Sequence, residues 1–275
     1  MRPQAAFRAG ALLLVLLLLA TLLGPLWLPD PAAIALADRL APPSAAHWLG
    51  TDELGRDLAA RLAQGGQISL LVAALTASLA AAIGTGIGLL AGFRGGALDA
   101  LLMRLTDAVM ALPLLPLLIV LAAIDPARLT DSPFAAIGWL ALIIAVTSWT
   151  GIARLVRAAT LSARSRDHVR AAQALGMGDV RLLWRHVLPE VASPMVVATT
   201  LSVGQVILVE SALSFLGLGV RPPLASWGAM LTGAMELLWT APALAVWPGG
   251  AIAVTVLAAT LLGEGLRHRL AVPAG

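Results

Sequence analysis

Six long stretches of this sequence contain no charged side chain, and they restrict the possible folds more than any other feature. A helix that crosses the ~30 Å hydrocarbon core of a bilayer needs about 20 predominantly apolar residues. Each stretch approaches or exceeds that length. They comprise residues 9–29, 62–93, 108–124, 132–153, 191–209 and 237–263. The pattern predicts an all-α integral membrane protein with six transmembrane helices.

The third stretch is the weakest of the six candidates. It has only 17 residues and contains Pro113 and Pro116, although neighbouring helices can satisfy the backbone groups that a proline leaves free. Residues 210–236 are mostly apolar as well, but glycine and proline interrupt them repeatedly. The interrupting residues are Gly217, Gly219, Pro222 and Pro223. We therefore expect a loop over residues 210–236.

The composition excludes several classes of protein. Only 12% of the residues are charged, whereas a soluble domain carries about 25%, so a water-soluble globule and a disordered chain are both excluded. All 18 basic residues are arginine, and the chain therefore lacks the lysine that a Walker A nucleotide-binding loop requires. If ATP drives this protein, another polypeptide binds it. The absence of cysteine excludes disulfides and thiolate metal sites.

The distribution of arginine predicts the orientation, because cytoplasmic loops are enriched in positive charge. With the N-terminus inside, thirteen arginines are cytoplasmic: Arg2, Arg8, Arg94, Arg104, Arg267, Arg269 and the seven between residues 154 and 185. The other side then holds Arg39, Arg56, Arg61, Arg128 and Arg221. Both termini are predicted to be cytoplasmic. Because the arginines are spread between the spans, the net charge of +3 does not indicate a nucleic-acid partner.

The first apolar stretch has two interpretations. Arg2 and Arg8 followed by an apolar run are also typical of a secretory signal peptide, with Ala33-Ile34-Ala35 as a cleavage site. The uncharged run of 21 residues is longer than the roughly 7–15 residues of a typical signal-peptide core, which favours an uncleaved first helix.

The longest hydrophilic segment lies between the fourth and fifth stretches, over residues 154–190. It contains seven arginines, three acids and two histidines, so it is too polar to cross a membrane. We expect Asp167 to cap a short helix over 168–175 that stops at Gly176, and Asp179 to cap a second helix over 180–188 that Pro189 ends. The arginines of this segment are expected to be individually solvated.

The second short helix carries one apolar stripe, formed by Val180, Leu183, Trp184, Val187 and Leu188. Two interpretations remain open on this pattern alone. The helix–Gly–helix hairpin can dock on a partner protein, or its amphipathic helices can rest on the lipid interface as an ordinary cytoplasmic loop.

A resemblance favours docking. The run 171–176 (Ala-Ala-Gln-Ala-Leu-Gly), eleven further residues and Leu188-Pro189 resemble the EAA loop of bacterial ABC-importer permeases, although Arg170 stands where that family has Glu. In the family this loop is the coupling helix that enters a groove of the ATPase subunit. The resemblance therefore implies ATPase-coupling roles for Ala171, Ala172, Leu175, Gly176, Asp179, Trp184, Leu188 and Pro189.

Three further motifs resemble the dipeptide, oligopeptide and nickel branch of these permeases. They are residues 47–57 (His-Trp-Leu-Gly-Thr-Asp-Glu-Leu-Gly-Arg-Asp), residues 214–228 and residues 261–267. The likeness is to the second permease of the pair. His47-Trp48 and Trp247-Pro248-Gly249 are more similar to the nickel permease, whereas Glu210 is more similar to the peptide members.

The resemblance implies a type I importer fold and a division into two parts. Residues 1–60 would form the first helix and a periplasmic loop, and residues 61–270 the permease core with its cytoplasmic coupling loop 154–190. It further implies an inner-membrane location and passage of nickel or di- or oligopeptides. The implied partners are a homologous second permease, two ATPase subunits that bind ATP and Mg²⁺, a periplasmic or lipid-anchored binding protein, and membrane lipid. No cofactor is implied in this chain.

The motif before the second apolar stretch predicts a structured turn. Gly50 and Gly55 permit tight reversals, and Asp52, Arg56 and Asp57 can form a local ion and capping network in which Asp57 caps the following helix. The motif residues are His47, Gly50, Thr51, Asp52, Gly55, Arg56 and Asp57. A metal-ligand pair of His47 and Asp52 is the alternative, but a durable metal site needs at least three converging ligands.

Two features lie inside apolar stretches. Gly84, Gly88 and Gly92 have the spacing that lets two helices approach closely, either within this chain or against a partner permease. Glu210 is the only acid within a long apolar run, and we expect it near the outer interface. With Ser214 it is a candidate for a transport-pathway or gating residue, and an interhelical hydrogen bond is the alternative role.

Two alternative functions are weaker. A membrane enzyme would need a motif such as Gly-x-Ser-x-Gly or His-Glu-x-x-His, and the sequence contains neither. An ion-gradient-driven secondary transporter would need buried polar groups at the midplane, which this chain almost lacks. The sequence therefore predicts a transport subunit without catalytic residues or a metal site.

Overall fold

The computed structural model describes residues 3–124 and 132–270, and these residues form no β-strand. The all-helical class is therefore confirmed. The helices are α1 (Pro3–Leu23), α2 (Leu58–Arg94), α3 (Gly96–Ala111), α4 (Leu114–Ala123), α5 (Pro133–Arg164), α6 (Asp167–Ala174), α7 (Asp179–Leu182), α8 (Leu188–Phe215), α9 (Trp227–Ala234) and α10 (Ala243–Leu270). A π-helical turn, Leu183–Val187, joins α7 to α8.

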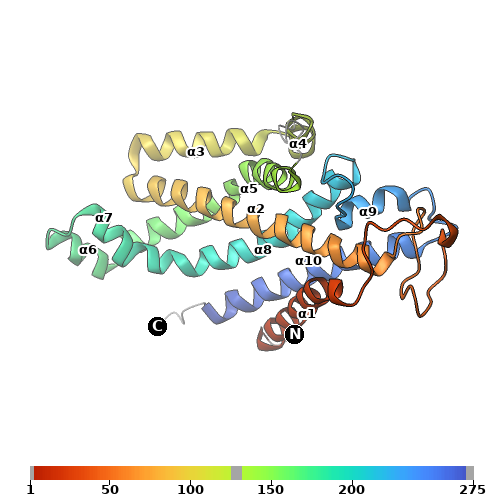
Figure 1. The fold of residues 1–275 in the computed structure, drawn as a ribbon. Helices are drawn as coiled ribbons and strands as arrows, with labels where there is room; N and C mark the ends of the chain where they lie inside the picture. Colours follow the sequence, from red (N-terminus) through yellow and green to blue (C-terminus); the bar gives the residue numbers. More distant parts are fainter. Residues whose placement is uncertain (1–2, 125–131, 271–275) are drawn as a thin grey trace.

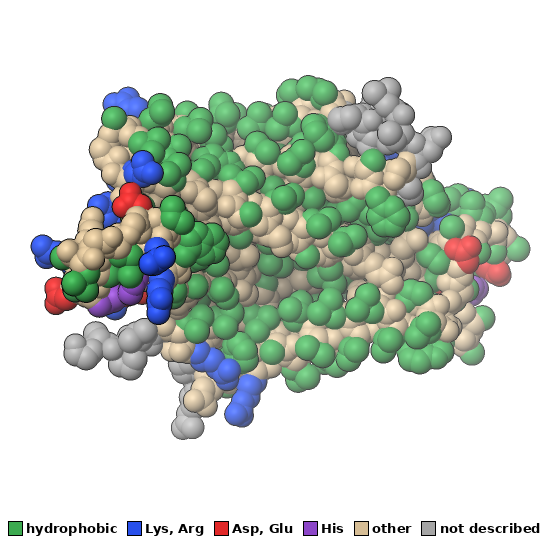
Figure 2. Space-filling view, turned by 60° about the vertical axis from the view of Figure 1, so that its left-hand side comes forward, with side chains coloured by type: hydrophobic (Ala, Val, Ile, Leu, Met, Phe, Trp, Pro, Cys, Tyr) green, Lys and Arg blue, Asp and Glu red, His purple; other side chains and the backbone are tan. Residues whose placement is uncertain are grey.

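Five of these helices are long and apolar enough to cross a membrane. They are α1, α2, α5, α10 and the continuous helix Asp179–Phe215 that contains α7 and α8. On the face shown in Figure 2, hydrophobic side chains cover most of the surface between the two ends, while charged and histidine side chains gather toward the ends. This distribution is typical of a protein whose sides face lipid.

The prediction of a single helix over the third apolar stretch, 108–124, is wrong. Instead, α3 begins at Gly96 and α4 follows after a bend of 86°, so that the pair forms one broken span at most. The break falls at Leu112, whose extended conformation (φ −74°, ψ 138°) is the one that a following proline imposes. Pro113 therefore ends α3 instead of being absorbed into a helix.

The expected loop over residues 210–236 is also wrong in part. The helix α8 continues through Glu210 to Phe215, and α9 occupies Trp227–Ala234, which leaves residues 216–226 as the loop between them. The Ser226 hydroxyl accepts a hydrogen bond from the Ala229 amide (3.3 Å) and so caps α9. The last long helix, α10, starts at Ala243 instead of 237.

The polar segment begins later than the sequence predicts, because α5 runs on to Arg164. Two arginines in this extension find acidic partners on α3. Arg157 donates two hydrogen bonds of 2.5 Å to Asp99, and Arg154 forms an ion pair with Asp107. These pairs offset the charge of the arginines and let the helix continue.

The start of α1 packs against the end of α10. The Arg269 guanidinium lies 3.8 Å from the centre of the Phe7 ring, and a Cβ on Gly10 would come within 2.7 Å of the Leu262 amide nitrogen. The start of α1 and the end of α10 therefore lie at the same end of the bundle. The helices α6 and α7 lie together at one end of the molecule, and α9 lies toward the opposite end (Figure 1). Arg2 and Arg128, two of the arginines that predict the orientation, fall outside the described residues.

The three glycines spaced by four residues in α2 pack against α5 of the same chain. A Cβ on Gly84, Gly88 or Gly92 would come within 2.5–2.8 Å of a backbone carbonyl oxygen of α5. Those oxygens belong to Trp149, Ala153 and Arg157, which follow the same spacing of four. Of the two alternatives for this motif, packing within the chain is the one observed.

Candidate functional site

The hairpin between α6 and α7 turns at Gly176, as the sequence predicts. Gly176 has a left-handed conformation (φ +81°), its amide donates to the Gln173 carbonyl (3.0 Å), and the Met177 amide donates to the Ala172 carbonyl (3.2 Å). These two hydrogen bonds define a Schellman motif, which satisfies the last carbonyl groups of α6. Apart from its chain neighbours, no described residue has an atom within 4 Å of the Cβ position at Gly176, so only the backbone conformation requires glycine.

The expected helix caps are wrong. Asp167 is the first residue of α6 and makes no capping bond, and α7 follows Gly178, also without a side-chain cap. Pro189 does not end the second helix but lies in the first turn of α8. A proline ring clashes with the carbonyl group four residues earlier and donates no hydrogen bond, and the wider π-turn Leu183–Val187 accommodates it.

The hairpin has one anchored face and one free face. Val169, Ala172, Leu182 and Val187 are buried in a cluster with side chains of α5. In contrast, Leu175, Val180 and Trp184 are 88%, 73% and 66% exposed. The expected stripe is therefore divided: Val187 is buried, Leu183 and Leu188 are half-buried, and Val180 and Trp184 project outward.

Several basic side chains around the hairpin are held in place. Arg166 and His168 both contact the Glu190 carboxylate, at 2.9 and 3.1 Å. Arg164 donates to the Gly92 carbonyl (3.0 Å) and its guanidinium lies 5.4 Å from the centre of the Phe93 ring. The expectation of individually solvated arginines is therefore wrong for these residues, which fix the hairpin to α2 and α8.

The predicted turn before α2 is present at the opposite end of the molecule. Gly50 and Gly55 both have positive φ angles, +82° and +73°. The Asp52 carboxylate accepts from the amides of Leu54 and Arg56 (2.9 and 3.0 Å) and from the Arg56 Nε (2.7 Å). It also lies 3.3 Å from the Nε of Arg61 in the first turns of α2. The Thr51 hydroxyl adds a hydrogen bond to the Asp38 carbonyl.

Asp57 caps α2, as expected. One carboxylate oxygen accepts from the Ala60 amide at 2.7 Å, and the other lies 2.9 Å from the Nδ1 atom of His47. His47 thus pairs with Asp57 and not with Asp52, which contradicts the alternative of a metal-ligand pair. The described residues hold no group of three or more histidine or acidic side chains that could bind a metal.

Glu210 lies at the centre of a buried polar cluster. It is fully buried and accepts hydrogen bonds from Ser214 one turn later in α8 (2.7 Å) and from Ser69 of α2 (3.0 Å). The Trp227 amide at the start of α9 donates to the Ser69 hydroxyl (3.2 Å), and the Trp227 indole donates to the Leu62 carbonyl (3.0 Å). Of the two roles considered for Glu210, the interhelical hydrogen bond is present, and Ser69 extends the cluster to the start of α9.

Sequence patterns do not indicate that Ser69 and Trp227 join this cluster. Ser69 lies 141 residues before Glu210 in the chain, and Trp227 lies 158 residues after Ser69. Ser69 is one of four hydroxyl residues in the apolar stretch 62–93, and only its position on the α2 face toward α8 distinguishes it from Thr76, Ser78 and Thr85.

Residues 84–270 match the protein family described as binding-protein-dependent transport system inner membrane component. The match covers more than half of the chain, including the hairpin, Glu210 and the Gly84–Gly92 contact. The chain belongs to this family. It is therefore a permease subunit of a binding-protein-dependent importer in the inner membrane.

Relatives of this permease align over nearly its whole length. A provisionally named peptide permease protein of Brucella suis biovar 1 is 43% identical over 94% of this chain and 84% of its own length. The nickel transport system permease protein NikC of Escherichia coli K12 is 37% identical over 96% of this chain and 92% of its own. The oligopeptide transport system permease protein OppC of Bacillus subtilis is 36% identical over 98% and 86%, respectively.

The fold of the permease is similar to that of a solved ABC transporter. A chain from an inward-facing crystal form of the MetNI methionine ABC transporter superposes with a TM-score of 0.62. The superposition covers 77% of this chain and 97% of the other at 17% sequence identity, and it therefore bears on the fold alone.

Proposed function

We propose that this permease forms half of a translocation pathway that ATP hydrolysis on separate subunits drives. A homologous second permease supplies the other half, two ATPase subunits bind ATP and Mg²⁺, and a periplasmic or lipid-anchored protein delivers the substrate. The chain itself catalyses no reaction and holds no cofactor. The observation that carries this proposal is the hairpin, which presents Leu175, Val180 and Trp184 to solvent beyond the ends of the apolar helices.

The exposed face of the hairpin is the surface on which an ATPase docks. Large apolar side chains exposed on a rigid, anchored element are typical of a protein interface. Of the residues with proposed coupling roles, Ala171, Leu175, Gly176, Asp179 and Trp184 lie on or beside this face. Ala172 and Leu188 pack in the cluster that holds the hairpin against α5, and Pro189 is exposed in the first turn of α8. Arg170 is exposed on α6, where it can form an ion pair with an acidic group of the ATPase.

The continuous helix Asp179–Phe215 carries motion from the hairpin to the buried polar cluster. From Trp184 to Glu210 it spans about 40 Å at 1.5 Å per residue. A rigid-body shift of the hairpin on ATP binding therefore moves Glu210 and Ser214 relative to Ser69 of α2 and Trp227 of α9. In this proposal, the cluster is the gate that responds to the ATPase, since coupling requires contacts that differ between the two states.

The substrate is a di- or oligopeptide, with nickel as the second candidate. Relatives named for peptide transport support the first class at 43% and 36% identity, and NikC supports the second at 37%. In cells that lack this gene, uptake of a radiolabelled dipeptide is expected to fall at least tenfold, while uptake of ⁶³Ni²⁺ is unchanged. Loss of nickel uptake alone would reverse the assignment, and unchanged uptake of both would contradict the transport proposal.

The permease has six spans, with both termini in the cytoplasm and the turn at Gly50 on the periplasmic side. The division at residue 60 then separates α1 and the periplasmic loop from the core 61–270 with its coupling loop 154–190. The packing of Phe7 against Arg269 supports an uncleaved α1 at the same end as the end of α10.

Reporter fusions test this topology. An alkaline phosphatase fused after Gly50 is expected to be active, and one fused after Pro273 inactive, because phosphatase folds only in the periplasm. A green fluorescent protein at the same two positions is expected to give the opposite pattern. Activity of the phosphatase at both positions would require an odd number of spans and would overturn the model of six.

A further inference from the structure

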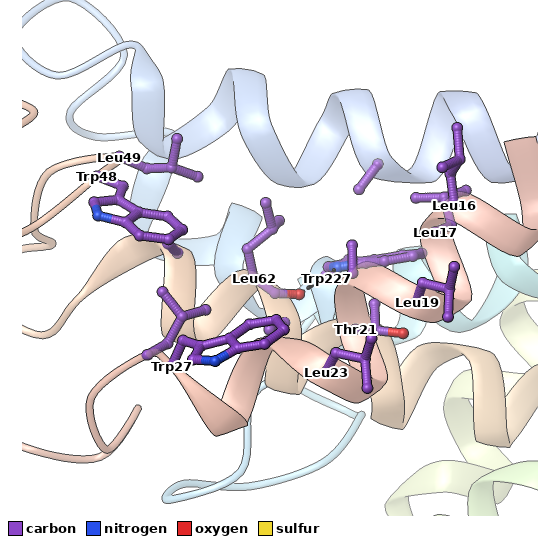
Figure 3. Close-up of a pocket in the computed structure, with 16 residues that line it drawn as sticks. Leu16, Leu17, Leu19, Thr21, Leu23, Trp27, Trp48, Leu49, Leu62 and Trp227 are labelled. Atoms are coloured by element: carbon purple, nitrogen blue, oxygen red, sulfur yellow. Dashed lines mark hydrogen bonds between the residues drawn. The ribbon is translucent and has the colours of Figure 1, made fainter.

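A cavity of about 500 Å³ lies between the C-terminal part of α1, the start of α2 and the start of α9 (Figure 3). Its sixteen lining residues are apolar except for Thr21, whose hydroxyl donates to the Leu18 carbonyl (3.1 Å). Two carbonyl groups on its wall also accept hydrogen bonds from protein side chains. The Thr21 carbonyl accepts from the Gln67 side chain (2.8 Å), and the Leu62 carbonyl accepts from the Trp227 indole (3.0 Å). An ordered water needs two to four polar partners, so this cavity suits apolar matter and not water.

The cavity opens beside the surface of α1 that faces lipid. Leu16, Leu19 and Leu23 line it and are nevertheless 53%, 47% and 39% exposed. The same exposed surface of α1 continues to Leu12 and Val15, which are 60% and 50% exposed. Because α1 is an apolar helix long enough to cross the membrane, lipid tails cover this surface. The cavity therefore connects the lipid-covered surface of α1 with the interior of the protein.

Two exposed tryptophans mark one end of the cavity. Trp27, just after α1, and Trp48, in the turn before α2, are 73% and 63% exposed and lie at the end opposite Leu16 and Leu17 (Figure 3). Neither indole nitrogen makes a hydrogen bond to a described residue, in contrast to the buried Trp227. Tryptophan gathers at the membrane–water interface, where the ring contacts acyl chains and the N–H group reaches polar headgroups. The long axis of the cavity therefore runs from headgroup level toward the bilayer core.

We infer that this cavity binds one acyl chain of a bilayer phospholipid, with its headgroup beside Trp27 and Trp48. The chain enters laterally past Leu19 and Leu23 and packs on the Trp227 ring. In the topology proposed above, the lipid belongs to the outer leaflet. The bound chain lies beside the close contacts that Thr21 and Gly24 make with Gly66 and Ala63 of α2. It also supports Trp227, through which the buried polar cluster holds α9.

The test compares two substitutions on the exposed surface of α1. Ala20→Trp places an indole into the cavity, whereas Val15→Trp adds the same group on the lipid-facing surface outside it. Both positions are exposed, so both variants are expected to reach the membrane at wild-type levels. The full chain, purified in mild detergent with its accompanying subunits, is examined by native mass spectrometry. The number of retained phospholipids is expected to fall by one in Ala20→Trp and to stay unchanged in Val15→Trp.

A photoreactive phospholipid locates the bound chain directly. A diazirine on the acyl chain is expected to label the segments around residues 16–28 and 48–63, and Ala20→Trp to abolish that labelling. If Ala20→Trp is poorly expressed, Trp48→Ala replaces it, since that change only removes a ring at the cavity mouth. An unchanged lipid count in Ala20→Trp, or a cross-link from a benzophenone amino acid at position 20 to another subunit, would overturn the inference. Neither readout depends on transport, so the importer proposal is tested separately.

Discussion

Replacement of Glu210 by leucine is expected to lower the stability of the permease substantially and to abolish transport. The carboxylate accepts from Ser214 and Ser69, and Ser69 in turn accepts from the Trp227 amide that starts α9. Leucine has a similar volume but no acceptor. Each buried polar group left without a partner costs about 1–3 kcal/mol, so the loss involves several groups at once. Thermal unfolding in detergent and uptake in cells are the two measurements.

Glu210→Gln is the matched control for that substitution. The glutamine oxygen accepts one serine hydroxyl and its NH₂ group donates to the other, so the cluster remains paired. We expect Glu210→Gln to unfold close to the wild-type temperature. Ser69→Ala removes the hydroxyl that links Glu210 to the Trp227 amide but leaves the Ser214 bond, and it is expected to be intermediate. If Glu210→Leu unfolds at the wild-type temperature, the cluster does not hold α9 in place.

The long spans could be predicted from the sequence because an uncharged run of sufficient length has few alternatives in a membrane protein. The prediction was wrong where a charge was paired or a proline changed direction. Arg154 and Arg157 marked the end of the fourth stretch, but their partners Asp107 and Asp99 lie on a helix about 50 residues earlier in the chain. The apolar pattern predicts a tolerated kink at Pro113, yet the chain turns by 86° there. The arginine pairs depend on residues far away in the chain, whereas the bend follows from the local restriction that Pro113 places on Leu112.

The candidate site divides in the same way. Gly176, Gly50, Gly55 and Asp57 were predictable because each acts on its immediate neighbours, through a positive φ angle or a cap three residues away. The partners of Glu210 depend instead on how α2, α8 and α9 rotate about their axes. A hydroxyl in an apolar helix carries no pattern that indicates its rotation, so Ser69 could be identified only in the folded structure.

Substitution of Gly176 by valine is expected to reduce transport at least tenfold while the chain still inserts at wild-type levels. The left-handed conformation at residue 176 costs a residue with Cβ about 1–2 kcal/mol, and a β-branched side chain more. About 1.4 kcal/mol corresponds to a factor of ten in the population of the native turn. Because Gly176 is exposed and nothing lies within 4 Å of its Cβ position, the penalty falls on the turn alone. Uptake and copurification of the ATPase subunits are the measurements.

Gly178 provides the matched control two residues away. It is also exposed with nothing within 4 Å of its Cβ position, but its φ of −67° suits any residue. Gly178→Val is therefore expected to transport normally and to retain the ATPase. Asparagine adopts the left-handed conformation more readily than other residues with a side chain, so Gly176→Asn should restore much of the activity. Normal transport by Gly176→Val would mean that the orientation of Leu175, Val180 and Trp184 is irrelevant to the ATPase. A loss in Gly178→Val equal to that in Gly176→Val would mean that added bulk at the surface, and not the geometry of the turn, disturbs docking.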